Sequence, residues 1–374
     1  MVIQILPVRN RKERRHFLTF PWKVYGDDPL WVPPLIPERM RTIDPERGVF
    51  FQRGTAELFA AWQNGKMVGT ICIAEDKITN QARSVNECMI GFLEYIPDYA
   101  VFCALIEKAV VWARNRDLES LAGPFNLDYE DGYGVLVRGR QRPPALLCGH
   151  TPAYYQEFME RYGFKPARAA NLAFAINLDE TPETRRLSRI ADKLRQRERI
   201  TVRGARFDEW ENEIDRVYNL LEKAFIWSDN PIPWQREALE NMVAPFRHIA
   251  DPELILFADV GGETVGWFPG IPNLNEVFIK VGGLRYPWNY AQLWWYMRRP
   301  VTSLTVKSVL VLPEYHKRGV AVLLFDEMAR RARARGCQWV DLSITSEDNP
   351  DTVGLSERMG AFEYKRWQVY QLSI

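Results

Sequence analysis

Cysteine and histidine are scarce in this chain, and their scarcity narrows the chemistry that it can carry. Five cysteines and four histidines are spread over 374 residues, and no two cysteines form a C-x-x-C pair. The cysteines are Cys72, Cys88, Cys103, Cys148 and Cys337. Disulfide-rich domains and structural zinc sites need closely spaced cysteine and histidine residues. We therefore expect neither a disulfide framework nor a bound metal, and we expect a reducing compartment, the cytoplasm.

Long apolar runs and a dominant charge are also missing. No stretch approaches the roughly 20 apolar residues that a membrane-spanning helix needs. At the N-terminus a short apolar stretch precedes a group of arginines, which is the reverse of the order in a secretory signal peptide. The formal net charge of +1 creates no overall field toward nucleic acids or anionic membranes. We therefore expect no nucleic-acid partner and no membrane partner.

Aromatic residues, in contrast, are abundant, at 13% of the chain with 13 tryptophans. At roughly 150 residues per domain, the length predicts two domains. Each half shows the same predicted order of helix, hairpin, strand, helix, strand, helix and strand. The hairpins are marked by Asn64-Gly65 in the first half and by Gly261-Gly262 in the second. This weak internal repeat predicts a duplication, with domains at 1–180 and 181–374.

Residues 181–200 are predicted to form a charged helix that links the two domains. The basic side chains are Arg185, Arg186, Arg189, Lys193, Arg195, Arg197 and Arg199. Contact with nucleic acid is one interpretation of this charge. Because acidic and apolar residues interleave and few aromatic residues flank the charges, a solvated linker helix is favoured.

The most informative segment predicts the end of a strand, a short basic loop and the start of a helix. It reads Val311-Leu312-Pro313-Glu314-Tyr315-His316-Lys317-Arg318-Gly319-Val320-Ala321. Gly319 lets the backbone approach a ligand closely, and Ala321 keeps the first helical turn small. Backbone N–H groups in such a loop and the positive end of the helix dipole both favour an anion. We therefore expect a phosphate-bearing cofactor.

The segment resembles the pyrophosphate loop of the GNAT (Gcn5-related N-acetyltransferase) family, whose pattern is Gln/Arg-x-x-Gly-x-Gly/Ala. A second family pattern, Asn-x-x-Ala-x-x-x-Tyr-x-x-x-Gly, is similar to the run from Asn349 to Gly360-Ala361-Phe362, in the correct order and spacing. The resemblance covers residues from about 200 to 374. It implies acetyl-CoA or a longer acyl-CoA as co-substrate. The cofactor-binding residues that it implies are Leu310, Val311, Leu312, His316, Lys317, Arg318, Gly319, Val320, Ala321 and Asn349.

The implied fold is α/β (α+β), with two GNAT-like acyl-CoA N-acyltransferase domains. Each would be a mixed, mostly antiparallel sheet flanked by helices. In the first half, Tyr95-Ile96-Pro97-Asp98 leads into a helix without the glycine pattern, whereas Tyr162-Gly163-Phe164 matches the end of the later helix pattern. The first domain is therefore expected to lack the pyrophosphate loop.

Two positions depart from the family pattern. His316 replaces the usual Gln or Arg, and Ser356 stands where the family often has a tyrosine that protonates the leaving thiolate. Ser356 is our candidate at that step, with a water, Tyr364 or unaided release of the thiolate as alternatives. Glu276, which follows the second hairpin, is the candidate base. No Ser/His/Asp set, P-loop or Rossmann fingerprint indicates a rival chemistry.

The expected activity is transfer of an acyl group from acyl-CoA to a small-molecule or peptide amine, by direct attack on the thioester. Two alternatives are a non-catalytic acyl-CoA-binding or sensing protein and a nucleic-acid-binding protein. An aromatic insertion at residues 286–297 predicts a wall of the acceptor site or a helix packed on the other domain; a membrane-surface helix is a weaker third interpretation. The identity of the acceptor and the oligomeric state are not indicated.

Overall fold

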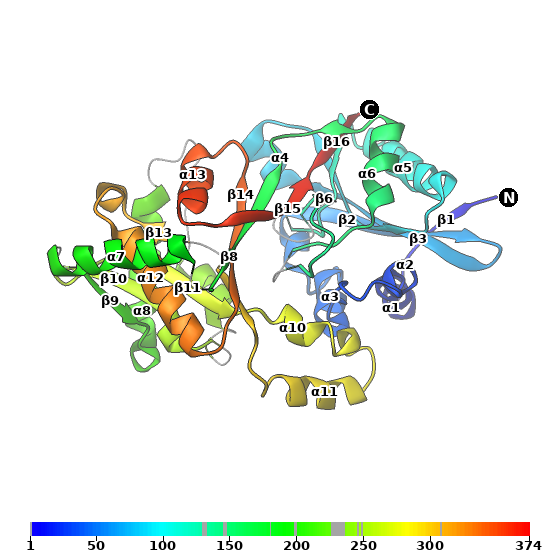
Figure 1. Ribbon diagram of the computed structural model, residues 1–374. Coiled ribbons are helices and arrows are strands. Elements are labelled where there is room, and N and C mark those ends of the chain that lie inside the picture. Colours follow the sequence, from blue (N-terminus) through cyan, green and yellow to red (C-terminus); the bar gives the residue numbers. More distant parts are fainter. Residues whose placement is uncertain are drawn as a thin grey trace.

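The computed structural model describes residues 2–128, 133–144, 148–179, 181–197, 200–225, 236–244, 247, 250–306 and 309–374. It contains two neighbouring sheets, each flanked by helices (Figure 1). Within the described strands, β4 pairs in parallel with β5 in the first sheet, and β12 pairs in parallel with β14 in the second, while the other pairs are antiparallel. The predicted fold class, with two mixed and mostly antiparallel sheets, is confirmed.

The first sheet has the strand order β1-β2-β3-β4-β5-β16-β7 in the described part of the chain. Its long hairpin turns at Asn64 and Gly65, which both have positive φ, at 51° and 70°, as a two-residue hairpin turn requires. The strands are β1 (Gln4–Pro7), β2 (Gly54–Gln63), β3 (Lys66–Asp76), β4 (Glu87–Tyr95), β5 (Ser120–Gly123), β7 (Lys165–Pro166) and β16 (Tyr370–Ser373).

The second sheet has the order β6-β15-β8-β14-β12-β11-β10-β9, and β13 pairs with β11 beside this path. Its hairpin between β10 and β11 turns at Gly261 and Gly262, as predicted. The strands are β6 (Val135–Arg138), β8 (Asn171–Asn177), β9 (Ile200–Gly204), β10 (Ile255–Val260), β11 (Glu263–Pro272), β12 (Ser303–Val306), β13 (Leu310–Val311), β14 (Trp339–Ser346) and β15 (Phe362–Gln368).

Helices cover both sheets and supply much of the two main cores. In the first core, α5 buries Val101, Phe102 and Leu105 completely. In the second, α12 buries Val320 and Leu324. The helices of the first half are α1 (Arg11–Thr19), α2 (Pro21–Tyr25), α3 (Ile36–Thr42), α4 (Lys77–Arg83), α5 (Tyr99–Arg114) and α6 (Ala153–Tyr162). Those of the second half are α7 (Pro182–Arg197), α8 (Trp210–Phe225), α9 (Arg236–Val243), α10 (Asn275–Phe278), α11 (Trp288–Tyr296), α12 (Val320–Ala334) and α13 (Pro350–Arg358).

The two halves of the chain exchange strands. β8 comes from the first half, yet it lies between β14 and β15 in the second sheet. β16 lies at the C-terminal end of the chain, yet it pairs with β5 and β7 in the first sheet. Only Val369 separates β15 from β16, so one segment runs from one sheet into the other (Figure 1). The sheets therefore do not separate at a single position, and the boundary at residue 180 stays a prediction.

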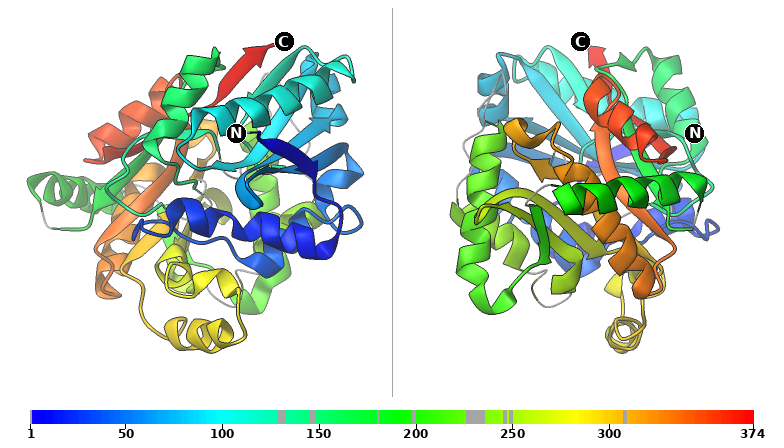
Figure 2. Two further views of the ribbon diagram at one scale, coloured as in Figure 1. Left: turned by 90° about the vertical axis from the view of Figure 1, so that its right-hand side faces the viewer. Right: turned by 60° about the vertical axis from the view of Figure 1, so that its left-hand side comes forward.

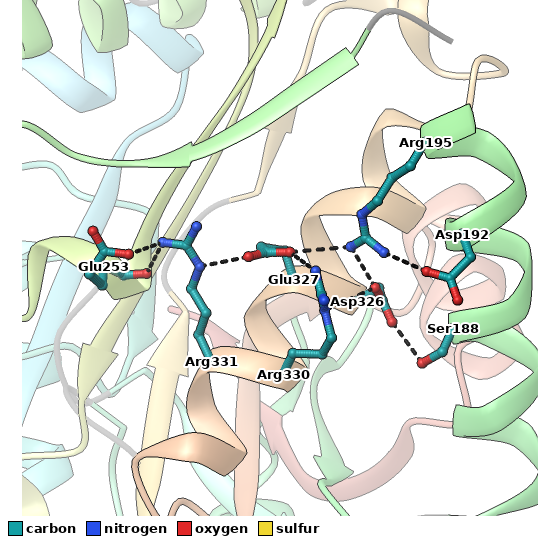
Figure 3. A network of polar contacts seen from close by, with 8 residues as sticks. All are labelled: Ser188, Asp192, Arg195, Glu253, Asp326, Glu327, Arg330 and Arg331. Atoms are coloured by element: carbon teal, nitrogen blue, oxygen red, sulfur yellow. Dashed lines mark hydrogen bonds and ion pairs between the residues drawn. The ribbon is translucent and has the colours of Figure 1, made fainter. Parts of the chain in front are cut away.

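The predicted linker helix, α7, packs along α12. The buried carboxylate of Asp326 accepts hydrogen bonds from Ser188 at 2.7 Å and from Arg195 at 2.6 Å (Figure 3). Arg195 also contacts Glu327 at 3.2 Å. At the other end of this contact, the side chain of Leu194 lies so close to Gly319 that an added Cβ would stand 2.5 Å from it. The linker helix is therefore fixed to the helix that follows the basic loop.

Two further observations concern membrane-spanning helices and metal-binding groups. No helix within the described ranges combines the length and the apolar character needed to cross a bilayer. In the same part of the chain, no group of three or more His, Cys, Asp or Glu side chains is placed to hold a metal ion.

Candidate active site

The basic loop ends at a helix N-terminus that no side chain caps. Gly319 is the N-cap of α12 and has φ 79° and ψ 6°, a left-handed conformation that glycine adopts without strain. The first N–H groups of any α-helix have no acceptor within the helix. Because no side-chain cap is present at Gly319, these N–H groups and the positive end of the helix dipole are available to an anion.

The strands beside this loop stop pairing where a ligand would lie. β12 pairs with β14 as far as Thr305 and Asp341, and β14 continues for five residues beyond that pair. β13 pairs with β11, and no pairing joins β13 to β14 within the described residues. The N–H of Leu312 donates to the carbonyl of Val265 on β11. Because backbone groups alternate along a strand, the N–H and C=O of Val311 point away from β11.

The basic side chains of the loop differ in their surroundings. His316 Nε2 lies 2.9 Å from the carbonyl oxygen of Val311, so His316 donates to that carbonyl when Nε2 carries the proton. Lys317 and Arg318 are exposed, and the guanidinium of Arg318 lies 5.0 Å from the ring centre of Tyr315. The predicted residues brought together here are Leu310, Val311, Leu312, His316, Lys317, Arg318, Gly319, Val320 and Ala321.

Asn349 and Ser356 both belong to α13. Asn349 is its N-cap, and its side-chain oxygen accepts a hydrogen bond from the N–H of Thr352 at 3.2 Å. Ser356 is buried in the last turn, where its backbone carbonyl accepts from the N–H groups of Met359 and Ala361. The contacts of Asn349 are those of a helix cap. Its role toward a cofactor, and that of Ser356 toward a thiolate, stay predictions.

Tyr364, the alternative proton donor, is buried beside a carboxylate. Its hydroxyl donates to Asp341 Oδ1 at 3.0 Å. Burial and the negative charge of Asp341 raise the pKa of Tyr364 well above its usual range. A phenol with a raised pKa is a weaker acid, so Tyr364 is poorly suited to protonate a leaving thiolate.

Glu276, the candidate base, lies at the start of β12, whereas the basic loop follows β13. One carboxylate oxygen accepts from the N–H of Thr302 at 2.8 Å, and the other accepts from the hydroxyl of Ser303 at 2.5 Å. Ser303 and Val311 both lie beside β11. The positions of β11 opposite these two residues are about seven residues apart, or roughly 20 Å along the strand. These contacts tie α10 to the start of β12.

The first half differs at the corresponding strand-to-helix junction. There, Asp98 is the N-cap of α5, and its carboxylate accepts from the N–H of Ala100 at 2.9 Å. The side chain of Asp98 thus accepts a hydrogen bond from one of the first N–H groups of α5. It also places a negative charge at this helix N-terminus, where α12 has a glycine. Repulsion between this carboxylate and a phosphate disfavours a pyrophosphate site at α5; that the first domain lacks such a loop stays a prediction.

Comparison with known families identifies the family of the region that contains the loop, β13, β14 and α12. Residues 214–361 match the model of the acetyltransferase (GNAT) family. These residues form a GNAT-family domain. The matched region includes the loop at 313–319, the open N-terminus of α12 and the helix α13, so the resemblance expected from the two motifs is confirmed.

Two curated proteins resemble the chain from end to end. One is named bacterial ceramide synthase, from Caulobacter vibrioides (strain NA1000 / CB15N); it is 27% identical over 380 residues, which cover 100% of this chain and 98% of that protein. The other is protein YghO of Escherichia coli (strain K12), which is 24% identical over 98% of this chain and 94% of its own length.

Solved structures agree on the fold of the whole chain. A tandem GNAT protein from the clavulanic acid biosynthesis pathway superposes with a TM-score of 0.58 and 13% identity, covering 100% of this chain and 98% of its own. A GCN5-related N-acetyltransferase from Sphaerobacter thermophilus gives a TM-score of 0.54 and 16% identity, covering 99% and 95%. The chain therefore has the fold of a tandem GNAT protein.

Outside the GNAT domain, sequence reasoning missed a polar group in the first half. Glu94 lies at the end of β4, and its carboxylate accepts hydrogen bonds from the hydroxyls of Tyr25 and Tyr155. Burial raises the pKa of Glu94 to about 7. One signal was present in the sequence: Glu94 is an acidic residue in the otherwise apolar run from Cys88 to Tyr95. Its tyrosine partners come from distant segments, and no pattern linked them to it.

Proposed function

We propose that this chain is an acyl-CoA-dependent N-acyltransferase whose acceptor is a long-chain amine. The observation that carries the proposal is the open N-terminus of α12 beside β13 and β14, which do not pair with each other within the described residues, inside a GNAT-family domain. The pyrophosphate of acyl-CoA would lie on the N–H groups that follow Gly319, with Lys317 and Arg318 adding positive charge. The backbone of Val311, which faces away from β11, would bind the pantetheine arm as an added strand, and His316 would release the Val311 carbonyl that it contacts.

The end-to-end likeness to a protein named bacterial ceramide synthase supports the choice of acceptor. A ceramide is the amide of a fatty acid with a long-chain amino alcohol. By this argument the donor is a fatty acyl-CoA rather than acetyl-CoA, and the acceptor is a lipid-like amine rather than a peptide.

In the proposed reaction, the amine nitrogen attacks the carbonyl carbon of the thioester. The tetrahedral intermediate then loses the thiolate, so a C–N bond forms and a C–S bond breaks. The nitrogen gives up a proton and the thiolate gains one, and the products are an amide and coenzyme A. Holding both reactants side by side supplies much of the acceleration. The N–H of Val311 is the candidate donor to the developing oxyanion.

Glu276 and Ser356 are retained as the candidate base and acid. Because Glu276 is tied to Thr302 and Ser303, it serves as a base only for an amine that reaches the start of β12. We expect Glu276→Gln to change the pH profile of kcat if the carboxylate accepts the proton. If Glu276 only anchors α10, the variant lowers thermal stability and leaves that profile unchanged. Ser356→Ala tests the proton donor in the same assay.

Two glycines at the ends of α12 provide a matched test of the cofactor site. Gly319 and Gly336 have nearly equal φ values, 79° and 81°. An added Cβ at Gly336 meets nothing within 4 Å, whereas one at Gly319 faces Leu194 beside the helix N-terminus. Asparagine tolerates this backbone conformation. We therefore expect Gly319→Asn to raise the KM for palmitoyl-CoA at least tenfold, and Gly336→Asn to leave it within twofold of the wild type.

The assay follows coenzyme A release and amide formation by mass spectrometry, with palmitoyl-CoA or acetyl-CoA and either sphinganine or spermidine. N-palmitoyl-sphinganine should be the main product. If only spermidine is acylated, the acceptor class is wrong. If Gly319→Asn and Gly336→Asn behave alike, the cofactor site is wrong.

One observation favours a second candidate, a non-catalytic acyl-CoA-binding protein. Ser356 replaces the family's tyrosine, and the pKa of Tyr364 is raised, so neither is a ready acid. For such a protein, palmitoyl-CoA should bind in calorimetry while no amine is acylated, and Gly319→Asn should weaken that binding.

A further inference from the structure

A cavity of about 210 Å³ is lined mainly by residues of the first domain, and Asn275 and Phe278 of the GNAT-family region complete its wall. It is bounded by the end of β4, the helices α1 and α3, and Phe278 of α10. Phe17, Trp31 and Phe92 supply apolar and aromatic walls. Cavities of this kind, with a few polar groups among apolar walls, are the usual form of small-molecule sites.

Glu94 is the polar group of interest in this cavity. The hydroxyls of Tyr25 and Tyr155 both donate to the same oxygen, Oε2, at 2.8 and 2.7 Å. The described residues provide no hydrogen bond to the other oxygen, Oε1. Tyr25 is itself fixed by stacking on Trp31, at 5.1 Å between ring centres. One carboxylate oxygen is therefore held in place, and the other remains for a ligand.

Among the described residues, no basic side chain pairs with this carboxylate, although Arg39 with Glu38 and His150 with Asp28 also face the cavity. Burial raises the pKa of Glu94 to about 7, and the two tyrosine hydrogen bonds oppose the rise; no basic side chain contributes. Lys23, on the same helix as Tyr25, donates instead to the carbonyl of Met67. A buried carboxylate without a counter-charge is costly, and a ligand ammonium would remove that cost.

We propose that this cavity binds a primary amine with an aliphatic tail, its ammonium group on Glu94 Oε1 and its tail along the aromatic walls. The inference stands on residues of the first domain and does not rest on the acyl transfer proposed above. Its test needs neither acyl-CoA nor turnover, so the two can fail separately.

The test is calorimetry at pH 8 with octylamine and with 1-octanol, which share a tail and differ in charge. Octylamine should bind the wild type and lose at least tenfold in affinity with Glu94→Gln, while octanol binds both equally weakly. Glu157→Gln, an exposed carboxylate on the helix that carries Tyr155, is the matched control and should behave as the wild type. Equal binding of octylamine to wild type and Glu94→Gln overturns the proposal, as does equal affinity of the wild type for the two ligands.

A second measurement needs no variant. Octylamine stays protonated from pH 5.5 to 8, whereas the ionised fraction of Glu94 rises from about one-thirtieth at pH 5.5 to about nine-tenths at pH 8, at a pKa near 7. Affinity of the wild type should therefore rise roughly 30-fold from pH 5.5 to pH 8. A flat profile contradicts the proposal even if Glu94→Gln does not fold.

An independent observation concerns the aromatic insertion. On α11, Trp288, Trp294 and Trp295 are 60%, 60% and 55% exposed. Half of the large apolar side chains that the described residues expose lie between 286 and 297. The helix lies at the edge of the molecule in all views, far from the loop that precedes α12 (Figures 1 and 2). Neither a helix packed on the other domain nor a wall beside that loop fits this position.

Positive charge accompanies these rings. The guanidinium of Arg298 lies 3.4 Å from the ring centre of Trp294, and that of Arg299 lies 5.3 Å from Trp295. Residues 277–313 contain no acidic side chain. The net charge of +1 for the whole chain does not reveal this local basic stretch, because acidic residues elsewhere offset its charge.

Tryptophan and tyrosine favour the headgroup level of a bilayer, and neighbouring basic residues bind anionic lipids. We infer that α11 is a membrane-surface helix that docks on anionic phospholipid bilayers. The expectation of no membrane partner came from overall charge and would be overturned by this docking.

Co-sedimentation with vesicles tests this inference. The protein should bind vesicles of phosphatidylcholine with 30% phosphatidylglycerol at least fivefold better than pure phosphatidylcholine. Trp294→Ser with Trp295→Ser should reduce binding at least fivefold, and the control Val111→Ser, at an exposed apolar side chain elsewhere, should not. No binding to either vesicle would overturn the inference. A soluble dimer that the double variant converts to monomer by light scattering would show that a second copy of the chain covers this face instead.

Discussion

The carboxylate of Glu94 makes a measurable prediction for stability, without any ligand. Its pKa rises from an ordinary value of 4.5 to about 7 because the folded protein buries it. The folded state therefore binds a proton more tightly than the unfolded state between pH 4.5 and 7. Stability from this group is complete below pH 4.5, is lost as pH rises toward 7, and stays constant above that.

The size of the effect follows from the two pKa values. At about 1.4 kcal/mol per pH unit, the wild type loses on the order of 3 kcal/mol between pH 4.5 and pH 8. Glu94→Gln keeps an oxygen for Tyr25 and Tyr155 and does not titrate. The variant should therefore match the wild type near pH 4.5 and become more stable, by on the order of 3 kcal/mol, at pH 8.

Urea unfolding followed by circular dichroism at pH 5, 6, 7 and 8 measures this difference. Other charged groups face the same cavity, among them Arg39 with Glu38 and His150 with Asp28. They are present in both proteins, so their titration cancels when the variant is subtracted from the wild type. Glu157→Gln should give a difference near zero at every pH. A constant difference between wild type and Glu94→Gln from pH 5 to 8 would refute the reasoning.

Three further predictions concern the contacts between distant segments. Removing residues 370–374 takes β16 out of the first sheet, and the urea midpoint should fall sharply; adding the peptide back at high concentration should recover part of it. Asp326→Ala removes the buried acceptor of Ser188 and Arg195 and should cost on the order of 2 kcal/mol in urea unfolding, whereas Asp192→Ala at an exposed pair should cost below about 1 kcal/mol. Leu194→Ala should recover part of the palmitoyl-CoA affinity lost in Gly319→Asn, and a strictly additive double variant would contradict the close contact.

Local signals in the sequence predicted the local elements well. Asn64-Gly65 and Gly261-Gly262 mark both hairpins because short turns need positive φ, which few residues other than glycine and asparagine adopt. Gly163 ends α6 with φ 111°, as expected of a helix C-cap. The loop before α12 could also be predicted, because the positive φ at its last residue requires glycine, here Gly319.

The strand exchange could not be predicted in the same way. β8 is a mostly apolar strand that suits an interior position in either sheet, and β16 is a four-residue strand of mixed character. The periodicity of a strand does not show which of the two sheets it joins. The cavity at Glu94 likewise depends on Tyr25 and Tyr155, which lie 69 and 61 residues from it in the chain. Such groups meet only through tertiary packing.

β16 is the last of the described strands to be synthesised. Until it is made, β5 and β7 lack the strand that lies between them, and until β14 and β15 are made, β8 lacks both of its partners. Neither sheet can therefore be completed during synthesis before strands of the second half have been made, so the first half cannot finish folding ahead of the second.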